Sequence, residues 1–173
     1  MKRLITIFFA LLLMFAAATT APAASRDSNS NSKVERFVQG LARDYSSHVE
    51  YSYISMNMLK SLFSMMLDGG DKELAKAMKR LKYIRKYGSS DSDGYQKLKK
   101  EMQPFLSNKD KVMGMELVVV NKEGAEATTI YSSKDGLLII TDENGTTLTV
   151  VFIAGLSMDV FNAMLENGIE LDF

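Results

Sequence analysis

The sequence predicts an α+β domain. We expect a single mostly antiparallel sheet of about five or six strands that ends in a four-stranded meander, with helices packed on one face. The last third of the chain carries this prediction, because four β-rich runs are separated by three turn signals. In the part before it, apolar residues recur at helical spacing in several segments, which predicts amphipathic helices that cover the sheet.

Residues 1–23 have the three parts of a secretory signal peptide. These parts are a cationic start at Met1-Lys2-Arg3, an apolar run from Leu4 to Ala18, and small residues that end in Ala21-x-Ala23. We therefore expect cleavage directly after this motif and a periplasmic or secreted protein. The chain has no cysteine, so it lacks the usual attachment point of a bacterial lipoprotein and cannot form a disulfide.

Residues 24–32 form a polar spacer that we expect to be disordered, and residues 33–173 have the length of a single domain. No later apolar stretch approaches the ~20 residues of a membrane helix, so no transmembrane segment is expected after signal cleavage. The charge is unevenly spread, with 12 Lys/Arg against 6 Asp/Glu in residues 71–111 and 2 against 10 in residues 112–173. Either a basic helical layer beside an acidic sheet or an anion-binding face explains this pattern.

The domain begins with a predicted helix over 33–46. A capping box opens it, in which the Ser32 hydroxyl accepts a hydrogen bond from the backbone N–H of Glu35. Alternation of apolar and polar residues over 48–54 predicts a short strand. Ser55 is then placed to cap a second helix, whose wide apolar face indicates a central position in the fold.

Asp71 is placed to cap a third helix. Residues 81–87 fit either a strand or an extension of that helix, and their tyrosines favour the strand. A loop over 88–94 leads to an amphipathic helix from Tyr95, with a break expected near Pro104.

The meander has predicted strands near 113–120, 125–132, 137–142 and 146–154. Its strongest turn signal is Asn144-Gly145, because a type I′ turn needs two residues that tolerate positive φ. The other two signals are Asn121-Lys122-Glu123-Gly124 and Ser133-Lys134-Asp135-Gly136. A final helix is expected from Ser157, which is placed to cap it.

Three segments carry a family resemblance: V-E-Y-S-Y-I-S-M-N-M-L-K-S-L from Val49, L-K-Y-I-R from Leu81, and L-L-I-I-T-D-E-N-G-T-T-L-T-V-V-F-I-A-G-L-S from Leu137. Together they resemble a family of small secreted Bacteroidetes proteins catalogued as a domain of unknown function, family 4252. The resemblance implies secretion and an α+β domain, and it brings no activity or catalytic residue with it. Members often look like lipoproteins, and this chain departs from them in having no cysteine.

Few residues are candidates for catalysis or metal binding. His48 is the sole histidine and no G-x-S-x-G elbow is present, so we predict no catalytic residue and a surface or strand-edge place for His48. Asp91-Ser92-Asp93-Gly94 matches part of a calcium loop, but its missing ligand positions favour a helix cap. The pairs Met56-x-Met58 and Met113-x-Met115 match copper(I) thioether sites, with core packing as the alternative. We predict no metal site and no cofactor.

The predicted binding surface is a basic run at a helix–strand junction, formed by Lys79, Arg80, Lys82, Tyr83 and Arg85. It is either a solvated face or a contact surface for an anionic ligand or an envelope protein, with Tyr83 offering a flat apolar area beside the charges. Nucleic acid is not expected as a partner because of the export signal. The leading hypothesis is a non-catalytic cell-envelope binding module. The alternatives are a hydrolase with an unrecognised active site and methionine-based copper(I) handling.

Overall fold

The computed structural model describes residues 32–44, 48–55, 57–58, 80–89 and 91–158. The predicted signal peptide, the spacer up to residue 31, the third helix, and most of the second and final helices lie outside these residues. The described elements in chain order are α2 (Lys33–Asp44), β1 (Val49–Ser55), β2 (Tyr83–Ser89), α5 (Ser92–Leu106), β3 (Lys111–Val112), β4 (Met115–Glu123), β5 (Glu126–Ser133), β6 (Gly136–Glu143) and β7 (Thr147–Ala154). No helix in this described part has the length and apolarity to cross a membrane.

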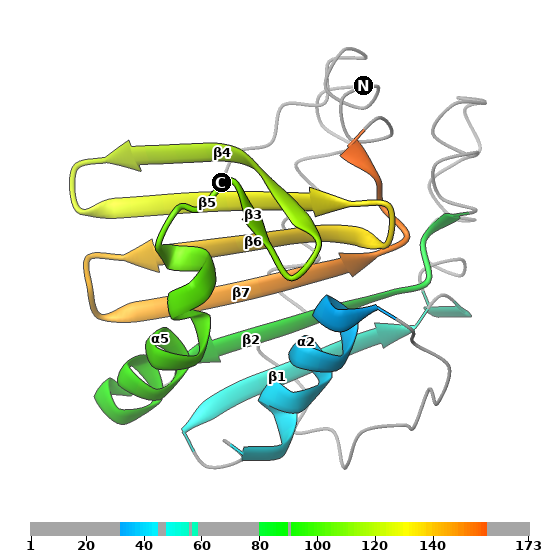
Figure 1. The fold of residues 1–173 in the computed structure, drawn as a ribbon. Coiled ribbons are helices and arrows are strands. Elements are labelled where there is room, and N and C mark those ends of the chain that lie inside the picture. The colour runs from blue at the N-terminus through cyan, green and yellow to red at the C-terminus, as the bar shows by residue number, and fades with distance from the viewer. Residues whose placement is uncertain (1–31, 45–47, 56, 59–79, 90, 159–173) are drawn as a thin grey trace, which may run out of the picture.

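One seven-stranded sheet forms the body of the fold (Figure 1). Its order is β1-β2-β7-β6-β5-β4-β3, and every neighbouring pair is antiparallel. The predicted α+β class and the meander of β4 to β7 are confirmed. The strand interpretation of residues 81–87 is also correct, because β2 pairs with both β1 and β7. The seventh strand, which the sequence pattern did not predict, is the two-residue β3 beside the start of β4.

Residues with positive φ mark two of the turns in the meander. Asn144 and Gly145 have φ of 55° and 69°, and the N–H of Thr146 donates to the carbonyl of Glu143 over 3.0 Å, as in the predicted type I′ turn. The predicted turn over 121–124 is wrong, because β4 runs on to Glu123. The actual turn there starts at Gly124, which has φ of 61°.

Side-chain oxygens cap the helices where the sequence predicts them. The N–H of Glu35 donates to Ser32 Oγ over 3.5 Å, and the N–H of Met58 donates to Ser55 Oγ over 3.4 Å. The predicted break at Pro104 is wrong, because α5 continues to Leu106. Since Pro104 stands in the last turn, its missing N–H removes a single bond near an end that frays anyway.

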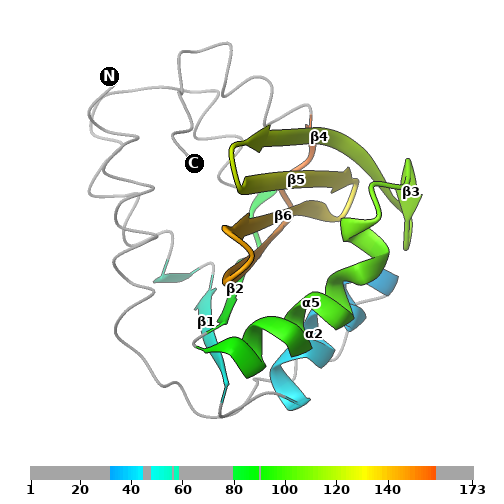
Figure 2. The same ribbon diagram turned by 90° about the vertical axis from the view of Figure 1, so that its left-hand side faces the viewer.

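Both described helices lie on the same side of the sheet, as Figure 2 shows. A hydrophobic core forms between them and the strands, and it is rich in aromatic rings. Along β2 the residues that face the helices are Tyr83, Arg85 and Tyr87, because side chains alternate between the two faces of a strand. This alternation decides which of the predicted site residues reach solvent.

Candidate functional site

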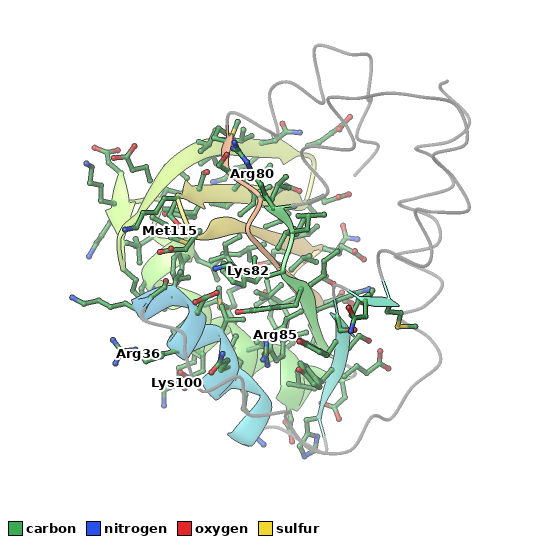
Figure 3. All side chains as sticks on the ribbon, turned by 90° about the vertical axis from the view of Figure 1, so that its right-hand side faces the viewer. Arg36, Arg80, Lys82, Arg85, Lys100 and Met115 are labelled. Atoms are coloured by element: carbon green, nitrogen blue, oxygen red, sulfur yellow. The ribbon has the colours of Figure 1, made fainter. Side chains whose placement is uncertain are left out.

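The predicted basic surface is divided by the fold. Lys79 lies outside the described residues, and Arg80 and Lys82 are exposed. In contrast, Tyr83 is 5% exposed and Arg85 is 1% exposed. Figure 3 shows Arg85 on the side of the sheet that faces α2. An exposed surface that includes Tyr83 and Arg85 was therefore a wrong prediction, because β2 is an inner strand whose odd-numbered residues point under the helix.

Arg85 stands instead in an aromatic cage of neighbouring tyrosines. Its guanidinium carbon is 5.1 Å from the ring centroids of Tyr53 and Tyr83 and 6.0 Å from that of Tyr51. Nη1 donates to the Tyr51 hydroxyl over 3.0 Å. Cation–π contacts at this range are each worth roughly 0.5–2 kcal/mol, so together they offset part of the cost of burying the charge.

The tyrosines of the cage join the sheet to α2. The Tyr83 hydroxyl donates to Glu35 Oε1 over 3.1 Å, and the Tyr87 hydroxyl donates to the backbone carbonyl of Val38. Burial raises the pKa of Tyr87 to about 12, and burial together with the Glu35 carboxylate raises the pKa of Tyr83 further. Burial lowers the pKa of Arg85, but the neighbouring phenol groups raise it by more. At neutral pH the cage therefore holds one cation among neutral phenols, which suits a structural role.

A polar cavity of about 210 Å³ lies where α5 begins, beside the turn between β6 and β7. This volume is below the ~300 Å³ of a typical ligand site, so only a small molecule fits it. Its lining consists mainly of hydroxyl, amide and carboxylate groups and is formed by Ser89, Asp91, Ser92, Tyr95, Gln96, Gly145, Thr146 and Thr147.

Asp91, which lines this cavity, pairs with the imidazole of His48, which is not part of the lining. His48 Nδ1 is 2.8 Å from Asp91 Oδ2, while Asp91 Oδ1 accepts from the N–H of Gly94 over 2.7 Å and caps α5. The Gly94 N–H and His48 lower the pKa of Asp91. Asp91 is thus a helix cap, as the sequence predicts, and His48 has the half-exposed place expected of it. A carboxylate that orients an imidazole through Nδ1 is also the arrangement that serine hydrolases use.

The other side of the cavity is tied to the meander. The Tyr95 hydroxyl donates to both carboxylate oxygens of Asp142 over 3.1 and 3.2 Å, and Lys99 Nζ lies 3.4 Å from the same carboxylate. The hydrogen bond with Tyr95 is the main cause that raises the pKa of Lys99. These contacts fix α5 against the β6–β7 hairpin.

The described methionines favour core packing over copper binding. Met115 is fully buried and Met113 is half-buried, so this pair does not present two thioethers to solvent. Met58 is 42% exposed, and Met56 lies outside the described residues. In the described part of the chain, no group of three acidic or histidine side chains is arranged to hold a metal ion.

The outer edge of β4 is the most apolar exposed feature of the described residues. Val118, Val119 and Val120 are 37%, 36% and 41% exposed. On the outer side, β3 pairs only with the first two residues of β4, and Asp110 accepts from the N–H of Leu117. Among the described residues no strand pairs with β4 beyond that point on this side. The segment from Val118 to Glu123 therefore offers a row of backbone hydrogen-bonding groups flanked by valines.

The sequence contains a feature that points to this edge, although the turn signals do not reveal it. Three successive valines are not the alternation of a half-buried strand, and an apolar run of this kind predicts cover on both faces. The register shift between Leu117 and Val119 allows the run, because a bulge re-aims the side chains that follow it.

The sequence profile of the family described as "Domain of unknown function (DUF4252)" matches residues 45–163, more than half of the chain. The chain belongs to this family. The DUF4252 match includes all seven strands and α5, so the cavity and the β4 edge lie within the family domain, while α2 precedes it. No curated protein and no solved structure matches the chain.

Proposed function

We propose that this DUF4252 protein is an exported binding module that takes up an extended protein segment along the outer edge of β4. The observation that carries the proposal is the valine-rich stretch from Val118 to Glu123, with whose outer side no described strand pairs. Such an edge gains backbone hydrogen bonds and buries apolar surface when another strand is added to it. Export is supported by the signal-peptide pattern of residues 1–23. The intact mass of the protein from the envelope fraction tests export, because it should lack residues 1–23.

In-cell photo-crosslinking tests the edge as a partner surface. A photoreactive amino acid at position 120 stands on the β4 edge, and the same residue at position 134 stands on the exposed turn between β5 and β6. In exporting cells we expect a discrete cross-linked product from position 120 and none of that mass from position 134. The same pattern of products from both positions would contradict the proposal.

A second surface for anionic ligands is proposed on the exposed residues Arg80 and Lys82, together with Lys79. Because exposed charges are screened beyond ~8 Å at physiological ionic strength, binding there should be strongly salt-dependent. Changing all three residues to Glu should abolish capture of anionic partners without moving the thermal midpoint. Equal capture by this variant and the wild type would leave these residues as a solvated face.

A hydrolase is the second candidate function, and the pairing of His48 with Asp91, a lining residue of the polar cavity, favours it. Its mechanism would use the imidazole as a general base oriented by the carboxylate. The test is ester, amide and glycoside hydrolysis by the wild type and by His48→Gln. Activity that disappears in His48→Gln supports the enzyme, and equal rates in both proteins remove His48 from any mechanism.

A further inference from the structure

We infer that the segment bound along β4 is β4 of a second copy of this chain, in a twofold antiparallel pairing centred on Val120. This inference depends on the proposed function, since it names the partner of the same edge. It follows from the direction of the backbone groups, from the side chains that this register brings together, and from the charges at the two ends of the edge.

The register follows from the hairpin that joins β4 and β5. Glu123 pairs with Glu126 across a two-residue turn, which makes them a hydrogen-bonded pair. Hydrogen-bonded and non-hydrogen-bonded pairs alternate along an antiparallel ladder. Asn121 and Val119 therefore bond to β5, while Val120 and Lys122 direct their N–H and C=O groups outward.

A twofold axis beside Val120 satisfies the outward groups of Val120. Val120 then exchanges two hydrogen bonds with Val120 of the second copy, and Lys122 lies opposite Val118 of that copy. Isologous contacts of this kind close after two subunits and leave no new edge to extend. The pairing also covers exposed valines on both faces of the sheet, since Val120 and Val119 point to opposite faces.

Charge complementarity favours the antiparallel direction. The hairpin tip carries Glu123 directly opposite Glu126, a like-charge pair that is unfavourable without a nearby cation. At the β3 end of β4, Lys109 and Lys111 are exposed beside Asp110, and Lys111 Nζ lies 2.7 Å from Glu116 Oε1 of the same chain. Antiparallel pairing brings each acidic tip to the end of the other copy that carries Lys109, whereas parallel pairing would place the two acidic tips together.

The dimer should be weak. A pairing of about six residues from each copy buries less surface than the ~1,600 Å² of a standard stable interface. We therefore expect a concentration-dependent equilibrium in the micromolar range rather than an obligate dimer.

Sedimentation equilibrium on the mature protein, from about 1 µM to about 1 mM, tests the inference. Val120→Lys and Val120→Glu each place like charges across the axis, so each variant alone should dimerise at least roughly tenfold more weakly than the wild type. An equal mixture of the two variants should regain dimers, because Lys then faces Glu. The control Gln103→Lys adds a charge at an exposed position of α5 and should behave as the wild type.

A second pair of variants tests the charged ends. Glu123→Lys with Glu126→Lys should weaken the dimer, and mixing this protein with Lys109→Glu should restore it. A wild type that stays monomeric throughout the range overturns the second copy as partner. If position 120 still cross-links to a different protein in cells, the proposed function stands and only the identity of the partner changes. Mixing that restores nothing overturns the twofold register.

Discussion

Replacement of Gly145 by Val should destabilise the domain through its backbone alone. Gly145 has φ of 69°, a region that a β-branched residue adopts at a cost of roughly 1–3 kcal/mol. A Cβ at this position would be 3.7 Å from the Tyr95 hydroxyl, an ordinary contact, so crowding by that atom adds nothing. For a domain of this size the cost corresponds to a fall of roughly 3–10 °C in Tm.

Urea denaturation of three variants isolates the conformational cost. Gly145→Asn should lie between the wild type and Gly145→Val, because Asn tolerates the left-handed region better than other non-glycine residues. Gly88→Val adds the same side chain to β2 at an ordinary φ with no atom within 4 Å, and it should have a smaller effect than Gly145→Val. Equal midpoints for Gly145→Val and Gly145→Asn would refute the reasoning.

Two further predictions concern Tyr87 in the core and Gly155, whose backbone lies close to that of Arg80. The free energy of unfolding should fall above pH 10, because the Tyr87 hydroxyl has a pKa of about 12 in the fold and 10.0 in the unfolded chain. The stabilisation from Tyr87 is therefore complete below pH 10 and is lost as the pH rises to 12. Between these two pKa values the free energy of unfolding falls by about 1.4 kcal/mol per pH unit because of this residue. Urea titrations at pH 8, 10 and 11 should therefore show a shallower fall for Tyr87→Phe than for the wild type. An equally steep fall in both proteins would contradict the role given to Tyr87. Gly155→Ala should cost more than roughly 3 kcal/mol, because its Cβ would lie 1.9 Å from the backbone carbonyl oxygen of Arg80 at a φ of 84°. Gly114→Ala has a φ of 86° with no atom within 4 Å and isolates the strain, so equal losses in these two variants would exclude the clash.

Local signals in the sequence predicted the elements that depend on local physics. The Asn144-Gly145 turn, the caps at Ser32, Ser55 and Asp91, and the alternation in β1 each involve residues within a few positions of one another. For these elements the preferred backbone conformation of each residue is also the one found in the fold.

The candidate sites depend on pairings between distant segments, which local signals do not determine. Arg85 is buried because β2 lies between β1 and β7, a placement that joins residues more than 60 positions apart. The cavity likewise needs α5 to meet the β6–β7 turn. The charged run near Tyr83 therefore fits an exposed surface when the sequence alone is considered. The position of β2 inside the sheet instead directs Tyr83 and Arg85 toward the helices.

Amide hydrogen exchange at Val120 tests the central claim most directly, because its N–H group points outward from β4 and gains protection only when another strand pairs with it. Residue-resolved exchange rates would be measured on the mature protein at low and high concentration, with the turn residue Lys134 as an exposed reference. The account predicts that the Val120 amide exchanges as fast as that of Lys134 in dilute protein and becomes at least roughly tenfold slower as the concentration rises. Exchange that stays fast at every concentration, and also in the presence of any partner that cross-links at position 120, would contradict it.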